Sequence, residues 1–103
     1  MAKTHRTHEE ATTEMFRNDP ELAAEYINSV LADGDESDLM LALRSLSKAN
    51  GGVQEIARQA DVNARTLYRT LSENGNPELK TLSSILKAMG MRLAVQPLKH
   101  SHG

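Results

Sequence analysis

The sequence predicts an all-α fold with one short β-strand near its C-terminal end. Over most of the 103 residues, apolar side chains recur at intervals of three and four, the period of an amphipathic helix. Capping residues, glycines or prolines bound each periodic stretch. Only after Gly90 do apolar and other residues alternate, which is typical of a strand. A chain of this length can bury one modest core, so we expect a single domain over residues 19–97.

The N-terminal arm, residues 1–18, is expected to be flexible or partly helical. Residues 1–8 show no apolar period and are expected to be mobile. Residues 9–17 fit a short helix with Ala11 and Met15 on one side. At the other end of the chain we expect a disordered tail over residues 98–103.

Two longer helices are predicted next. Asp19-Pro20 is a strong helix start, because aspartate caps and proline is favoured at the first helical position. An apolar stripe follows until Gly34, and Asp35 can cap the next helix, which runs toward Gly51-Gly52. Residues 39–43, LMLAL, are apolar without interruption. This helix is therefore either central in the bundle, which we favour, or its extra face meets another chain.

Residues 53–71 are interpreted as two short helices joined by a three-residue bend. Asp61-Val62-Asn63 interrupts the helical period, and Asn63 is a good N-cap for a helix that starts at Ala64. The inward residues are Val53, Ile56, Ala57 and Ala60 before the bend, and Leu67 and Leu71 after it. This is the spacing of a helix-turn-helix, whose second helix lies in the DNA major groove. The alternative is an ordinary helical hairpin whose arginines are solvated surface charges.

A further helix is predicted from Asn76-Pro77, an N-cap followed by proline, to the stop at Gly90. Its inward face would be Leu79, Leu82, Ile85, Leu86 and Met89. A helix-turn-helix followed by a loop and a capped helix resembles the lambda-repressor-like (XRE) DNA-binding domains. We therefore expect a lambda-repressor-like helical bundle.

The resemblance is closer to HigA-like antitoxins, the antidotes of addiction modules. It covers AEYINSVLADGD (24–35) and the long run 41–95, above all LYRTLS…GNPELKTL…ILKAMGMRL. Two positions depart from the pattern. Asp61 stands where the bend usually has glycine, so an aspartate must adopt the left-handed turn. Val53 stands where many such domains have a phosphate-contacting glutamine, a role that Gln54 would take.

The resemblance implies an antitoxin of a type II toxin–antitoxin module that also represses its own operon as a dimer on a palindromic operator. Arg65 and Arg69 would lead the contacts with duplex DNA, and Gln54 and Lys80 would hold phosphates. The full expected DNA-binding set is Gln54, Asn63, Ala64, Arg65, Thr66, Tyr68, Arg69 and Lys80. A free-standing plasmid- or phage-type repressor remains the alternative, since a helix-turn-helix serves both.

The net charge of −2 conceals a division of the chain. Residues 1–43 carry three Lys/Arg against ten Asp/Glu, a net charge of −7, and residues 44–103 carry nine against four, a net charge of +5. The acidic half either attracts a basic protein, here a small basic toxin resembling a ribonuclease, or merely keeps the chain soluble. The residues expected to bind the toxin are Glu21, Glu25, Tyr26, Asp33, Asp35, Glu36, Asp38 and Leu41.

The strand over residues 91–96 would have two unpaired edges. Pairing with the same strand of a two-fold mate would remove this problem and make a homodimer through Met91, Leu93 and Val95. The alternative is that the segment packs extended against its own bundle.

Enzymatic, metal-binding and membrane roles are not expected. The four histidines His5, His8, His100 and His102 all lie in the terminal arms, and Gly51-Gly52 lacks the Lys-Ser/Thr of a phosphate loop. Cysteine is absent, which fits a reducing cytoplasm. No apolar run approaches the ~20 residues of a membrane helix, and the first residues are too polar for a signal peptide. We predict a non-enzyme without cofactor or metal.

Overall fold

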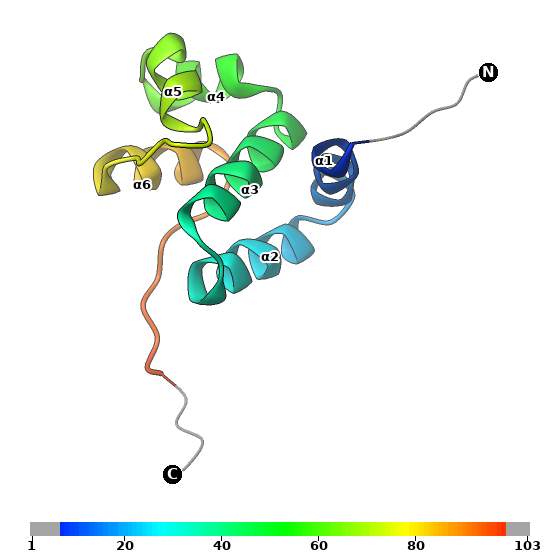
Figure 1. Cartoon of the computed structure of the whole chain (residues 1–103). Helices are drawn as coiled ribbons and strands as arrows, with labels where there is room; N and C mark the ends of the chain where they lie inside the picture. Colours follow the sequence, from blue (N-terminus) through cyan, green and yellow to red (C-terminus); the bar gives the residue numbers. More distant parts are fainter. Residues whose placement is uncertain (1–6, 99–103) are drawn as a thin grey trace, which may run out of the picture.

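The computed structural model describes residues 7–98, and these fold into six α-helices without a β-strand. In chain order they are α1 (His8–Asn18), α2 (Pro20–Asp33), α3 (Glu36–Ala49), α4 (Val53–Ala60), α5 (Ala64–Thr70) and α6 (Leu79–Ala88). Figure 1 shows α3 in the middle, with α1 and α2 on one side and α4, α5 and α6 on the other. The predicted all-helical architecture is confirmed. None of these helices is long and apolar enough to cross a bilayer.

Helix α1 is more regular than the sequence suggested. Thr7 and Glu10 form a reciprocal capping box at its start. The helix packs on α3 and α2 through Thr12, Thr13 and Phe16, and the Phe16 ring meets Tyr26 of α2 edge-on at 5.3 Å between centroids. The predicted packing side was wrong: Ala11 and Met15 are exposed. The aromatic ring on the Thr12–Phe16 stripe offers more apolar area to bury, so that stripe turns inward.

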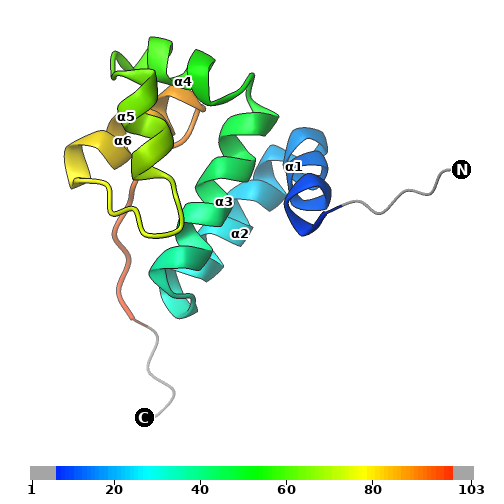
Figure 2. The same ribbon diagram turned by 45° about the horizontal axis from the view of Figure 1, so that its top comes forward.

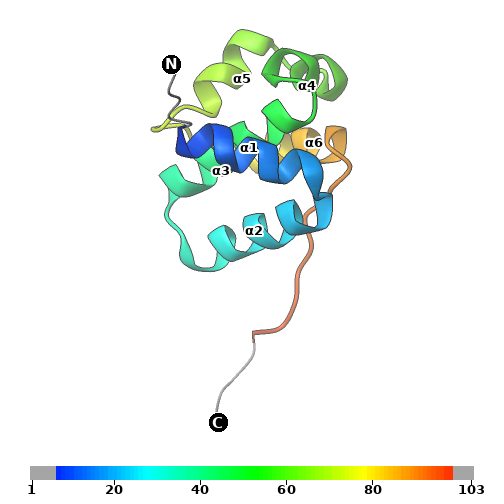
Figure 3. The same ribbon diagram turned by 90° about the vertical axis from the view of Figure 1, so that its right-hand side faces the viewer.

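The starts of α2 and α3 are confirmed. Asp19 caps α2 with Pro20 in the first turn, and Asp35 caps α3. Helix α3 contacts α1, α2 and α4, and Leu43 in the middle of the helix is fully enclosed. Central burial is therefore confirmed for Met40, Ala42 and Leu43 of LMLAL, whereas Leu39 and Leu41 are half-buried. Figure 3 shows α1 crossing in front of α3 between α2 and the α4–α5 pair.

Helices α4 and α5 meet at the predicted bend. Asp61 adopts the left-handed conformation, with φ 60° and ψ 45°, and it ends α4. The N–H of Val62 donates to the carbonyl of Ala57 at 2.9 Å, while the half-buried Val62 side chain packs against the core. Asn63 caps α5 by accepting from the N–H of Thr66. Leu67 and Leu71 are buried, as their spacing predicted.

The predicted start of α6 at Asn76-Pro77 was wrong. The helix begins at Leu79, because Glu78 is extended (φ −66°, ψ 154°) and takes the N-cap position without a side-chain bond. Leu79 then points outward and is 71% exposed, whereas Ile85 and Leu86 reach the core. The loop before α6 is held by close packing: a Cβ on Gly75 would lie 1.7 Å from the carbonyl oxygen of Thr70. The chain therefore folds back tightly on the end of α5 before α6 begins.

The segment after α6 is extended through residue 98 and is not assigned as a strand. Met91 and Leu93 are half-buried against the core, while Val95 is 99% exposed. The predicted strand needs a second chain for pairing, so it stays a prediction. The expected mobile start and the tail fall largely outside the described residues, as do His5, His100 and His102, whereas His8 is the exposed first residue of α1.

Candidate nucleic-acid interface

Helix α5 is held so that one face is exposed. Leu67 and Leu71 anchor its inner side, and the Asp61 turn sets its direction relative to α4. The outer side carries Arg65, Thr66, Tyr68 and Arg69, all exposed, with Tyr68 at 55%. Figure 2 shows α5 at the front of the molecule, on the opposite side of α3 from α1. Two cations and two hydrogen-bonding side chains therefore share one accessible helix face.

The remaining predicted DNA contacts flank that face, and they differ in exposure and in whether their polar atoms are already hydrogen-bonded. Gln54 is exposed in the first turn of α4, and Lys80 is exposed in the first turn of α6. Lys80 lines a hollow together with Asp61 and Val62, so it lies beside the α4–α5 turn. Ala64 is half-buried. The Asn63 Oδ1 atom is occupied, because it accepts from the N–H of Thr66 at 3.0 Å.

The cations near this face differ in whether they are paired. Arg58 of α4 is bound to Glu55, with Nε–Oε1 at 3.1 Å and Nη2–Oε2 at 2.5 Å. Hydrogen bonds from Arg58, and then from Gln59, lower the pKa of Glu55 to about 2, and the same pair raises the pKa of Arg58. Over residues 7–98, neither Arg65 nor Arg69 has an ion pair. Like charges four residues apart on a helix are mildly destabilising, so this pair of arginines is not explained by stability.

An acidic surface begins on α2, across α3 from α5, and reaches the start of α3, where Asp35 and Glu36 share a hollow with Glu73 of the loop after α5. It runs along α2 and the α2–α3 junction, with exposed carboxylates at Glu21, Glu25, Asp33, Asp35, Glu36 and Asp38. Tyr26 and Leu41, the expected apolar anchors, are half-buried. Figures 1 and 3 place α2 away from α5. A partner on α2 and a partner on α5 would therefore approach different sides of the molecule.

Two of these carboxylates also have a structural role that the sequence analysis assigned to Asp35 alone. The N–H of Asp38 donates to Asp35 at 2.9 Å, and the N–H of Asp35 donates to Asp38 at 3.3 Å. The backbone bond from Asp38, and then the Ser37 hydroxyl, lower the pKa of Asp35. Tyr26 likewise has a structural role, because its ring packs edge-on against Phe16. The spacing D-x-x-D after Gly34 was the available signal for this reciprocal cap.

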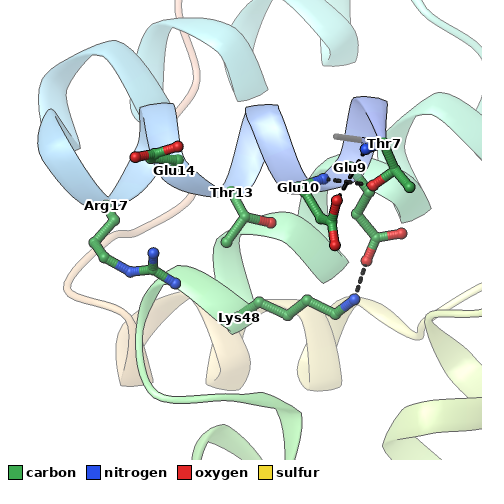
Figure 4. Close-up of a pocket in the computed structure, with 7 residues that line it drawn as sticks. All are labelled: Thr7, Glu9, Glu10, Thr13, Glu14, Arg17 and Lys48. Atoms are coloured by element: carbon green, nitrogen blue, oxygen red, sulfur yellow. Dashed lines mark hydrogen bonds and ion pairs between the residues drawn. The ribbon is translucent and has the colours of Figure 1, made fainter. Parts of the chain in front are cut away.

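A polar network joins α1 to the end of α5. Glu9 of α1 accepts from Lys48 of α3 and lies 4.0 Å from the Nε atom of Arg44, whose Nη1 atom donates to the carbonyl oxygen of Leu71. Glu9 and Lys48 line an open polar hollow of about 650 Å³ between α1 and α3. Figure 4 shows Thr13 and Arg17 on its wall. Sequence reasoning missed this network, because residues 27 positions apart in the chain carry no local signal of contact. Within residues 7–98, no cluster of three metal-ligating side chains occurs.

Comparison with known proteins gives two matches. Residues 8–97 match a family described as "Probable addiction module antidote protein". The chain is also 31% identical over 71 residues to a protein of Haemophilus influenzae described as uncharacterized, and the match covers 69% of this chain and 72% of that protein. No solved structure matches significantly. The family match extends from the first helix to the extended C-terminal segment.

Proposed function

We propose that this chain, which belongs to the family of probable addiction module antidote proteins, is the antitoxin of a type II toxin–antitoxin pair. The observation that carries the proposal is the family match over residues 8–97, which spans all six described helices. A free-standing repressor would fit the α4–α5 pair equally well, but it would not account for membership of an antidote family. In this proposal the protein acts in the cytoplasm and is not an enzyme.

The second part of the proposal is DNA binding by a helix-turn-helix. Helix α4, the bend 61–63 and α5 would form the motif, with α5 in the major groove. The support is the left-handed Asp61 turn, the cap at Asn63 and the exposed, unpaired Arg65 and Arg69. A bidentate arginine–guanine contact is worth ~1–3 kcal/mol of discrimination. Thr66 and Tyr68 would contact bases or phosphates beside the arginines, and Gln54 and Lys80 would fix the phosphate backbone.

Repression of the chain's own operon would require a homodimer. A two-fold dimer reads half-sites about one helical turn apart, ~34 Å, on a palindromic operator. We place the dimer contact at residues 91–95, paired antiparallel across the axis. This segment supports the placement because it is extended and has no ladder partner within residues 7–98.

The third part of the proposal is the toxin, a small basic protein. Its capture is assigned to the acidic surface of α2 and the α2–α3 junction, with Tyr26 and Leu41 as apolar anchors. Opposite fields mainly accelerate association and select the partner, whereas buried apolar contacts slow dissociation. Because α2 lies on the other side of α3 from α5, a toxin held on α2 would leave the outer face of α5 open to the operator.

The experiment is capture of the basic protein encoded next to this chain, measured by stopped flow at low and high salt. The variant neutralises Glu21, Glu25, Asp33 and Glu36, and it keeps the Asp35–Asp38 cap of α3 intact. We expect association to slow by about tenfold or more at low salt and much less at high salt, with operator binding unchanged or slightly tighter. The matched control neutralises Asp61 and Glu78, which line the hollow beside the α4–α5 turn, by replacing them with Asn and Gln, and it should leave the capture rate unchanged. If no neighbour-encoded basic protein binds the wild-type chain, the antitoxin proposal fails.

A further inference from the structure

A narrow groove runs between α2 and the extended segment after α6. Ile27, Asn28 and Leu31 of α2 line one side, and the segment lines the other with Met91, Leu93 and the polar Arg92 and Gln96. Leu31 is 47% exposed although it is a large aliphatic residue. The groove has a volume of about 280 Å³, at or below the ~300–1,000 Å³ range of small-molecule sites. A space of this size and polarity suits a few aliphatic side chains rather than a cofactor.

The same segment carries an apolar side chain without a partner. Met91 and Leu93 face the bundle, but Val95, two residues further on the same side of the extended chain, is 99% exposed. Figures 1 and 3 show this segment leaving the six helices. Val95 therefore does not reach the groove of its own chain, and each chain has one unfilled groove and one uncovered valine.

Antiparallel pairing of two such segments brings these two features together. Because side chains alternate, only registers that pair odd residues with odd residues keep the apolar side facing the helices. Centring the pair on Arg92 would oppose two like charges, which is destabilising. Centring it on Leu93 instead places Val95 of one chain opposite Met91 of the other and sets Arg92 opposite Ala94. In this register the two-fold symmetry places Val95 of each chain at the groove of the other.

We propose that Val95 of a second copy fills the groove between α2 and the extended segment, so that α2 is part of the homodimer interface. This inference rests on the proposed dimer and assigns its register and its second contact surface. The occupant is a copy of this chain because the groove, the uncovered valine and the unpaired backbone edge all belong to one polypeptide. Their arrangement closes under a two-fold axis without further partners.

The test is an exchange of charges between the groove and its occupant, with the full chain studied by analytical ultracentrifugation. Leu31→Asp places a carboxylate in each groove, and Val95→Lys brings an ammonium into the partner's groove. Val95→Lys alone should raise the dimer dissociation constant by about a hundredfold, because each groove then receives an ammonium beside Arg92. Leu31→Asp alone should raise it by about tenfold, because the carboxylate displaces an apolar contact but lies in the same groove as Arg92. An equimolar mixture should dimerise to within about threefold of wild type, because one groove then holds an ion pair and the other is native. Ala32→Asp, on the neighbouring exposed position of α2 outside the groove, is the matched control and should dimerise normally.

A second measurement separates failure of this inference from failure of the dimer itself. The chain lacks cysteine, so Leu93→Cys should cross-link rapidly on mild oxidation across the two-fold axis. Arg92→Cys should not, because its Cα atoms would be more than the ~7 Å apart that a disulfide can bridge. If Leu93→Cys cross-links but Leu31→Asp dimerises as wild type, the proposed dimer stands and the groove assignment is wrong. If the wild-type chain is monomeric at high concentration, both proposals fail.

Discussion

Replacing Arg65 and Arg69 of α5 by alanine, singly and together, tests the proposed DNA contacts most sharply. Each arginine would contribute ~1–3 kcal/mol per half-site if it binds guanine. A dimer on a palindrome presents it twice, so one substitution removes about 2–6 kcal/mol, which corresponds to a loss of about 30-fold to 10⁴-fold in operator affinity. If the arginine binds phosphate instead, the loss is smaller and uniform across sequences.

The structure predicts that folding is not affected by these changes. Both side chains are exposed and make no ion pair within residues 7–98. Removing one of two like charges at i and i+4 relieves ~0.2–0.5 kcal/mol of repulsion. The melting temperature should therefore move by less than ~4 °C, since 1 kcal/mol corresponds to about 4–8 °C in a domain of this size.

The assay is fluorescence anisotropy with a labelled promoter fragment at several salt concentrations. If the arginines bind phosphates, each substitution should lower the slope of log K against log salt by about 0.9 for every phosphate that the variant no longer neutralises. Arg58→Ala is the matched control, because that exposed arginine is already paired with Glu55, and it should change affinity little. A folded double variant that binds the promoter within threefold of wild type would refute the assignment of α5 as the recognition helix.

Three further predictions concern the fold. The pKa of Glu55 lies near 2 instead of its usual 4.5. The pair with Arg58 therefore stabilises the native state above about pH 4.5, and this contribution is lost as the pH falls toward 2. Glu55→Gln should flatten that part of a thermal-unfolding pH profile. Arg44→Met leaves the carbonyl of Leu71 without its charged donor and should cost about 1–3 kcal/mol in urea unfolding. Leu43→Ala should lower the free energy of unfolding by about 2–5 kcal/mol. Leu79→Ala should change it by no more than ~0.5 kcal/mol, because that side chain is mostly exposed. Equal losses in the two leucine variants would contradict the observed start of α6.

The predictable parts of this fold are those that local chemistry determines. A capping aspartate acts on backbone groups within three residues, so the starts of α2 and α3 could be predicted from Asp19-Pro20 and Asp35. The bend at Asp61 and the inward Leu67 could be predicted from periodicity interrupted over three residues, whereas the left-handed conformation of Asp61 was implied by the family resemblance. These local features also place Arg65 and Arg69 outward, so the candidate site could be proposed from sequence.

The errors arose where packing between segments decides the structure. The chain folds back tightly on the end of α5 at Gly75, and α6 begins only at Leu79, after an extended Glu78. The inward face of α1 is chosen by the meeting of Phe16 with Tyr26, which no local pattern encodes. Pairing of the extended segment depends on a second chain, so neither the sequence nor a single copy determines it.

The antitoxin assignment is tested most directly by growth of a heterologous host that expresses the neighbouring reading frame under an inducible promoter. The proposed function predicts that induction of that frame alone arrests growth, and that co-expression of this chain restores the growth rate of uninduced cells. A variant with Arg65 and Arg69 replaced by alanine should rescue equally well, because toxin capture is assigned to the other side of α3. Arrest that persists in the presence of the folded wild-type chain would contradict the antitoxin assignment.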